Sequence, residues 1–217
     1  MCCTGLLILR RKTVPMRIAV AAVLAALLLP GLLWAGDTSS LRPPKGSPVA
    51  LIAFEDLQCS DCAAAEPLLQ EASAKYNVPV VRRDFPLPRH EWSFDAHVLA
   101  RYFDSISPKT AKDLPLGEQF RRWVYANQTS IERTNLRGMA ERFADQHGLE
   151  LPVTVDPKGE LAKLVQADFA LGQQVGVSRT PTVFVVSETE RSAPFVENLD
   201  RDRLFAMIEQ MQAAAKK

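Results

Sequence analysis

Residues 49–62 have the sequence VALIAFEDLQCSDC, which joins a short apolar run to a pair of cysteines. The run from Val49 to Phe54 is suited to a strand that is buried on both faces. A helix is predicted to begin near Cys59, because three alanines, which favour helix, follow Cys62 directly. The sequence therefore predicts a buried strand that leads to two cysteines at the start of a helix.

The spacing of Cys59 and Cys62 predicts a dithiol that forms and breaks a disulfide reversibly. At a helix N-terminus, the unpaired N–H groups and the helix dipole favour a thiolate at Cys59. Cys62, one turn further along, is better shielded and attacks only after Cys59 has formed a mixed disulfide. Ser60 and Asp61 lie between them and are candidates for tuning, since a negative charge on Asp61 opposes a second one on Cys59.

Two other roles for the cysteine pair are less economical. Half of a zinc site would need further ligands, but the histidines number only three and no second CxxC follows the leader. An inert disulfide between residues so close in sequence would constrain the unfolded chain very little. We therefore predict redox chemistry, with no metal and no cofactor.

The remaining elements alternate in a recognisable order. Strands are predicted over 78–84 and 182–186, and 193–197 is predicted to form a hairpin with the latter. The first strand and 78–84 are expected to be parallel because a helix connects them. Helices are predicted over 93–104, 116–127, 131–147, 159–175 and 199–215. The order βαβ, a helical insertion over about 91–176, then ββα indicates an α/β fold over 49–217.

The N-terminal 36 residues predict export. Four basic residues precede an apolar run from Ile18 to Leu29, and small residues follow at Ala35 and Gly36. This is the pattern of a secretory signal peptide, and a retained N-terminal anchor is the alternative. The body is expected in the periplasm, tethered to the inner membrane if the leader is kept. Residues 37–48 are polar and rich in proline, and are predicted to be a linker with no apolar pattern to pack.

The charge balance indicates which class of partner to expect, and the length of the linker indicates the oligomeric state. The 26 basic and 25 acidic residues give a formal net charge of +1, without the clustered lysine and arginine typical of nucleic-acid binding. No dimerisation module fits into residues 37–48, so a monomer is expected.

Around the cysteines, the sequence resembles the DsbA-like thiol–disulfide oxidoreductases of the thioredoxin superfamily. The resemblance covers essentially 49–215, and the residues that carry it are FEDLQCSDC at 54–62, Pro67, DFPL at 84–87 and VSRTPTVFV at 177–185. It implies a thioredoxin fold with a helical subdomain inserted between the second and third core strands. It also implies a cis peptide bond between Thr180 and Pro181, in a loop whose backbone binds a substrate strand.

Two positions depart from the family pattern. Ala53 stands six residues before Cys59, where family members often bury a carboxylate that relays the proton of the second cysteine. Glu55 and Asp56 are near in sequence but are expected to face elsewhere. Arg179 stands where a glycine commonly precedes Thr-Pro; its cation would favour the Cys59 thiolate, and a solvated loop residue is an equal alternative.

The three histidines are expected to contribute little. His90 matches a family histidine that follows the Phe-Pro-Leu segment, and its expected role is to pack at the start of the inserted helices. No role is assigned to His97 or His147.

The resemblance implies an exported enzyme that donates its Cys59–Cys62 disulfide to cysteine-containing exported proteins. A membrane quinone-linked partner would then reoxidise it. One alternative is a reductase or isomerase of the same fold. Another is a thioredoxin-fold chaperone or a soft-metal-binding module that uses the thiolates as ligands. A reduction potential separates the first two hypotheses, and metal content after purification identifies the third.

Overall fold

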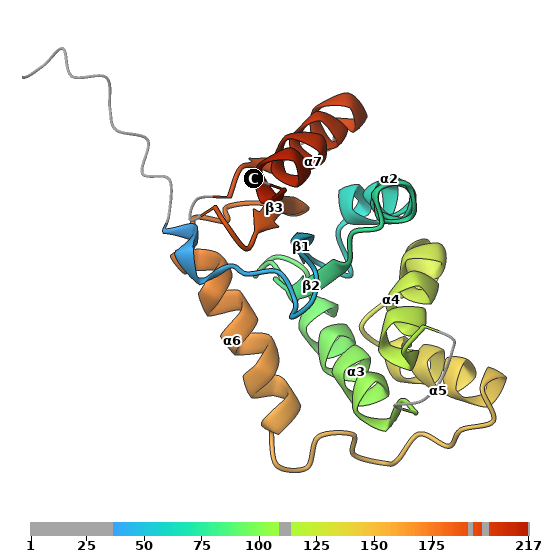
Figure 1. The fold of residues 1–217 in the computed structure, drawn as a ribbon. Helices are drawn as coiled ribbons and strands as arrows, with labels where there is room; N and C mark the ends of the chain where they lie inside the picture. Colours follow the sequence, from blue (N-terminus) through green and yellow to red (C-terminus); the bar gives the residue numbers. More distant parts are fainter. Residues whose placement is uncertain (1–36, 109–113, 191–192, 197–199, 217) are drawn as a thin grey trace, which may run out of the picture. The chain divides into compact units, whose positions relative to one another are not determined.

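A four-stranded mixed sheet forms the centre of the computed structural model, which describes residues 37–108, 114–190, 193–196 and 200–216. Its strand order is β2-β1-β3-β4 (Figure 1). β1 (Val49–Glu55) pairs in parallel with β2 (Val80–Asp84) and antiparallel with β3 (Thr182–Ser187). β3 pairs antiparallel with β4 (Phe195–Val196). The parallel first pair and the terminal hairpin are confirmed.

The helical insertion between the second and third strands is also confirmed. α2 (Ser60–Tyr76) connects β1 to β2 and continues through Pro67, and α7 (Arg201–Ala215) follows β4. The inserted helices are α3 (Ser93–Ile106), α4 (Leu116–Asn127), α5 (Leu136–Gln146) and α6 (Glu160–Gln174). Short 3-10 turns lie at η1 (Thr38–Ser40) and η2 (Gln128–Ser130).

One inserted helix starts later than the sequence pattern predicts. α5 begins at Leu136 rather than at 131. The Asn135 side chain accepts the N–H of Glu132 and donates to the carbonyl of Ser130, which holds a turn where the helix was expected. Asparagine commonly makes such local side-chain bonds in place of helical ones.

Alternate residues of β1 face two different hydrophobic layers, as the period of a strand requires. Leu51 and Ala53 pack with residues of α2 and α7, whereas Ile52 and Phe54 pack with residues of and next to α6. Figure 1 shows α2 and α7 on one side of the strands and α6 on the other. The whole of β1 is buried, as its apolar sequence predicts.

A third hydrophobic cluster joins the inserted helices to the cysteines. Phe103, Phe120 and Phe143 come from α3, α4 and α5, and their ring centroids lie 4.8–5.1 Å apart. Cys59 and Cys62 belong to the same cluster. The cysteine pair therefore lies where the sheet and the helical insertion meet.

The expectation that nothing in residues 37–48 packs is wrong for Leu41. This side chain is 2% exposed and belongs to the layer that contains Ile52 and Phe54. Nearby, the Thr38 hydroxyl accepts the N–H of Ala193. The predicted signal peptide or anchor lies outside the described residues, and among those described no helix is long and apolar enough to cross a membrane.

Candidate active site

The two cysteines occupy different environments at the start of α2. Cys59 is the N-cap residue of the helix, with extended backbone geometry, and Cys62 lies in its first turn. Both are free thiols, 7% and 2% exposed respectively. Cys59 lines a cavity of about 630 Å³, whereas Cys62 is not among the residues that line it. The Cys59 sulfur is therefore the one that an incoming group can reach.

Hydrogen bonding lowers the pKa of Cys59 to about 5. The largest contribution comes from the Cys62 side chain, with smaller ones from Thr180 and from the N–H groups of Cys62 and Asp61, while burial acts in the opposite direction. The shift has the sign predicted for a cysteine at a helix N-terminus. Near neutral pH, Cys59 is therefore a thiolate.

Burial raises the pKa of Cys62, and the hydrogen bond and negative charge of the neighbouring Cys59 raise it further. The backbone N–H of Asp56, 3.5 Å from the Cys62 sulfur, acts in the opposite direction. Cys62 is therefore a thiol at neutral pH, able to donate its hydrogen to the Cys59 thiolate. The pair holds one negative charge on the accessible sulfur and one proton on the shielded sulfur.

The loop before β3 completes the reactive cavity. The peptide bond between Thr180 and Pro181 is cis, as the resemblance implied, and the Thr180 carbonyl lies 3.4 Å from the Cys59 sulfur. Asp61 and Arg179 are exposed and also line the cavity, whereas Ser60 is exposed but is not among the lining residues. The full lining comprises Cys59, Asp61, Ala64, Ala65, Leu68, Leu87, Arg89, Ser178, Arg179, Thr180 and Pro181.

Asp56, expected to face elsewhere, is fully buried beneath the active-site segment. Its Oδ1 accepts the N–H of Gln58 at 2.7 Å and the hydroxyl of Ser93 at 2.6 Å. Its Oδ2 accepts the N–H of Leu87 at 2.6 Å and lies 2.8 Å from Nδ1 of His90. One carboxylate thus ties the segment before Cys59 to the chain that follows β2, and His90 contributes a polar contact beyond packing.

Glu55 was also expected to face elsewhere, but it lies in the interior and is 2% exposed. It follows Ala53 by two residues on β1, so both side chains lie on the face that α2 covers. Glu55 Oε2 accepts from Nη1 of Arg82 at 2.7 Å, while Oε1 has no hydrogen-bond partner. Burial raises the pKa of Glu55. The buried carboxylate that is missing at Ala53 is thus present two residues later.

Glu55 belongs to a cluster of ion-paired carboxylates and guanidiniums. Arg82 contacts Glu55, Glu66 and Glu118, and Arg122 contacts Glu66 and Glu118, at 2.7–3.3 Å. After burial, the neighbouring Glu66 carboxylate also raises the pKa of Glu55, while Arg82 and Arg121 act in the opposite direction. The net effect makes Glu55 easier to protonate than an ordinary glutamate.

The inserted helices also hold the active-site segment. The Nε2 group of Gln128 donates to the carbonyls of Leu57 and Cys59, at 2.9 and 3.1 Å. The N–H of Trp92 donates to Oε1 of Gln58 at 3.0 Å. Sequence reasoning did not assign these roles, because the partners lie 34–71 residues apart in the chain.

The thioredoxin family matches this chain over residues 44–210, and the chain belongs to that family. Among the solved structures that superpose on this chain are DsbA-like proteins. α-DsbA1 of Wolbachia pipientis superposes with a TM-score of 0.67 at 16% identity, covering 83% of this chain and 98% of that one. ScsC of Proteus mirabilis gives 0.61 at 18% identity, covering 91% and 81%. At these identities, the likeness is one of fold.

Two further similarities concern proteins with stated activities. α-DsbA2 of Wolbachia pipientis, described as a thiol-disulfide exchange protein, superposes with a TM-score of 0.60 at 14% identity and covers 92% of this chain and all of that one (100%). A Na(+)/H(+) antiporter, NhaA 1 of Salinispora arenicola, is 26% identical over 169 residues, which are 75% of this chain. The chain spans about a quarter (24%) of the antiporter's length.

Proposed function

We propose that this protein is an exported thiol–disulfide oxidoreductase that donates its Cys59–Cys62 disulfide to cysteines of protein substrates. The observation that carries the proposal is the asymmetry of the pair. Cys59 has a lowered pKa and lines a cavity beside the cis-proline loop, while Cys62 is shielded and has a raised pKa. The likeness to a thiol-disulfide exchange protein supports it, as does the likeness to a periplasmic thioredoxin-like protein of Salmonella enterica.

The first chemical step breaks the disulfide of the oxidised protein. A substrate thiolate attacks the Cys59 sulfur in the cavity, a new sulfur–sulfur bond forms, and the Cys59–Cys62 bond breaks with its electron pair on Cys62. Burial disfavours a thiolate at Cys62, so this sulfur must take up a proton as it leaves. Glu55, which is buried and has a raised pKa, is the proton donor in this proposal, in place of the carboxylate that Ala53 lacks.

The second step releases the substrate. A second substrate thiolate attacks the substrate sulfur of the mixed disulfide, and Cys59 leaves as a thiolate. A thiol of low pKa is the better leaving group, so a Cys59 pKa of about 5 favours donation of the disulfide over its retention. This direction distinguishes the proposal from a reductase or isomerase of the same fold.

In this proposal, a partner restores the Cys59–Cys62 disulfide after each transfer. The reduced pair would pass its two electrons to a membrane quinone-linked partner, and the protein would act as a monomer in the periplasm. Its substrates would be exported proteins with free cysteines. No further cofactor enters the cycle, since the sulfur atoms carry both electrons.

The proposal is tested by oxidative refolding with residues 37–217 in the disulfide form. A reduced, unfolded protein with a single native disulfide serves as substrate, without other oxidant. We expect one substrate disulfide to appear for each Cys59–Cys62 disulfide lost, and none with the Cys59→Ser variant. Absence of transfer by the wild-type protein would refute donation, and a thiolate-bound metal in the purified protein would favour the metal-binding alternative.

A further inference from the structure

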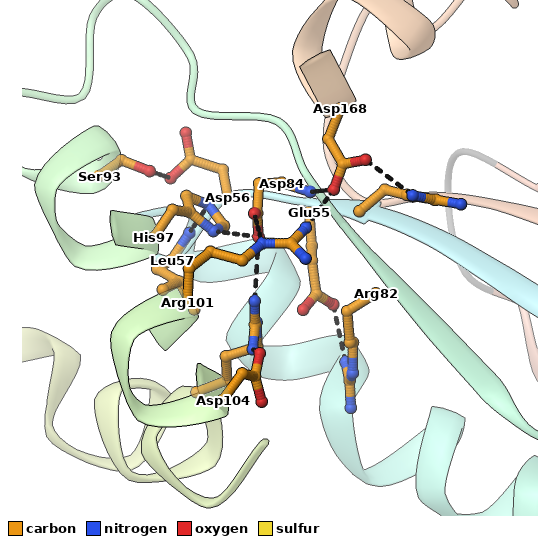
Figure 2. Close-up of polar contacts among 12 residues, drawn as sticks. Glu55, Asp56, Leu57, Arg82, Asp84, Ser93, His97, Arg101, Asp104 and Asp168 are labelled. Atoms are coloured by element: carbon orange, nitrogen blue, oxygen red, sulfur yellow. Dashed lines mark hydrogen bonds and ion pairs between the residues drawn. The ribbon is translucent and has the colours of Figure 1, made fainter. Parts of the chain in front are cut away.

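A buried histidine outside the reactive pair contacts the segment that leads to it. His97 lies in α3 with no exposed surface. Its Nδ1 is 2.8 Å from Oδ1 of Asp84, at the end of β2, and its Nε2 is 3.3 Å from the backbone nitrogen of Leu57. Figure 2 shows the ring between Leu57 and Asp84. Leu57 stands two residues before Cys59, so the histidine bridges the inserted helices and the active-site segment.

The partners of the ring fix its state. The Leu57 backbone nitrogen can only donate, so Nε2 of His97 must accept and carries no proton. Asp84 is an ionised carboxylate, so Nδ1 must donate to it. Burial acts to raise the pKa of Asp84, but the charges of Arg121 and Arg101 and the hydrogen bond from His97 hold it well below its usual range. His97 is therefore a neutral imidazole with its proton on Nδ1.

Asp84 is held rigidly from several elements. Arg101, one turn along α3 from His97, donates to Oδ2 of Asp84, and Arg121 of α4 donates to Oδ1 at 3.1 Å. The backbone N–H of Asp84 donates to Asp168 of α6, which Arg101 also contacts. Figure 2 shows Asp84 and Asp168 on either side of Arg101. The acceptor that orients His97 is thus fixed by β2, α3, α4 and α6 together.

We infer that His97 is a positioning residue for Cys62, acting through the backbone of the active-site segment. The N–H of Leu57 points to His97, and the N–H of the preceding residue, Asp56, points to the Cys62 sulfur. Fixing Leu57 fixes the peptide beside it and therefore the donor that stabilises negative charge on Cys62. Leu57 has no exposed surface, so without His97 its N–H would be buried without a partner. The segment would then move to reach water or another acceptor.

The inference rests on the proposed function, and its test isolates the step in which Cys62 attacks. Residues 37–217 are reduced, Cys59 is converted to its mixed disulfide with glutathione, and formation of the Cys59–Cys62 bond with release of glutathione is followed at pH 7. We expect His97→Leu to slow this closure about tenfold, since a buried donor loses its acceptor. His97→Gln retains an acceptor at the end of its side chain and should recover most of the rate.

The chain provides a matched control in His147, which lies at the end of α5 and bonds to the Phe143 carbonyl. His147→Leu and His147→Gln should close at the wild-type rate. A folded His97→Leu protein that closes as fast as wild type would overturn the inference. If that variant does not fold, the protonation state of the His97 ring in the wild-type protein decides.

The state of the ring is measured directly in the wild-type protein. Imidazole ¹⁵N shifts distinguish the three histidines by comparison with the His90→Gln and His147→Gln variants. We expect a protonated Nδ1 and an unprotonated Nε2 on His97 at pH 7. The opposite tautomer, or an imidazolium, would overturn the inference. Wild-type protein that neither closes the mixed disulfide nor passes a disulfide to a substrate would instead refute the proposed function.

Discussion

At the scale of single residues, the local environments of Cys59 and Cys62 give the two thiols different pKa values. Cys59 and Cys62 are chemically identical and one helical turn apart, yet the pKa of the first is lowered and that of the second is raised. The helix N-terminus and the hydrogen bonds around Cys59 stabilise its thiolate, while burial disfavours one at Cys62. The charge is therefore on the sulfur that faces the cavity.

This difference predicts how the two thiols react. In the reduced protein, alkylation of Cys59 should rise with pH through about 5 and then level off, while Cys62 stays unreactive at neutral pH. Cys59→Ser should abolish disulfide exchange, and Cys62→Ser should trap mixed disulfides with substrates. Mass spectrometry of the alkylated protein identifies the reacting residue. Equal alkylation rates at pH 7 would contradict the assignment.

The same shift predicts a pH dependence of stability in the reduced protein. The folded pKa of Cys59 is about 5 and its ordinary value is 9.0, so the unfolded chain binds more protons between these values. The stabilisation is complete above about pH 9 and is lost as the pH falls through about 5. Urea unfolding measures the free energy of unfolding of the reduced and disulfide forms. As the pH rises across this interval, this free energy should increase for the reduced form relative to the disulfide form. A constant difference between the two forms would count against the lowered pKa of Cys59.

Proton supply to Cys62 gives a second prediction at this scale. Glu55→Gln keeps the shape of the side chain and a contact for Arg82 but removes the proton donor. We expect disulfide transfer to slow by about a hundredfold, the usual lower range for loss of a general acid. Glu118→Gln alters the same buried cluster at its outer edge and should change the rate little. Stopped-flow rates for the three proteins decide, and equal rates for Glu55→Gln and wild type would exclude Glu55.

Asp61 gives a third prediction. It is exposed in the first turn of α2 and lines the cavity with Cys59, so its charge opposes the thiolate. Asp61→His should make the protein a stronger oxidant by tens of millivolts, on the order of one pKa unit of thiolate stabilisation. Because an acid suits the start of a helix, the change should also slightly destabilise both redox forms. Equilibration with glutathione buffers measures the effect, and an unchanged or more reducing potential would contradict it.

At the scale of elements, the sequence is most informative where the decisive interactions are local. The junction of β1 and α2 was predictable because an apolar run, a cysteine pair and helix-forming alanines follow one another directly. The insertion was predictable because its helices have clear apolar periodicity. The roles of Glu55 and Asp56 were not, since strand period gives a face but not the partner on it. Arg82, Ser93 and Leu87, which hold them, are 27–37 residues away.

The contacts of His97 and Leu41 could not be predicted from the sequence either. A buried histidine on a helix usually has a satisfied partner, and nothing in the sequence around His97 indicates that the partner is the backbone of Leu57, 40 residues earlier. Leu41 stands alone among polar residues and prolines, so no periodic pattern reveals that it packs on the sheet. Both contacts depend on how distant segments approach after folding.

Leu41 provides a prediction for the segment before β1. Leu41→Ala removes a side chain that is 2% exposed and should lower the free energy of unfolding by about 2–4 kcal/mol. Leu164→Ala, at a position 50% exposed on α6, is the matched control and should lower it much less. Urea unfolding of residues 37–217 gives both values. Similar small changes in the two variants would show that this segment does not contribute to the core.

At the scale of the whole molecule, the helical insertion does more than enlarge the domain. It shields Cys62 within an aromatic cluster, and it supplies Gln128, Trp92 and His97 to hold the segment before Cys59. The sheet and α2 present the pair, and the loop before β3 forms the facing wall of the cavity. Of the two cysteines, only Cys59 therefore lines the cavity.

The reduction potential of the Cys59–Cys62 pair, measured on residues 37–217 in glutathione buffers, tests the proposed direction of exchange most directly. Stabilisation of the Cys59 thiolate favours the reduced pair and so makes the disulfide oxidising, while Asp61 moderates the effect. We predict a potential between that of thioredoxin, about −270 mV, and that of strongly oxidising DsbA, about −120 mV. A value at or below about −270 mV would contradict disulfide donation and identify the protein as a reductase.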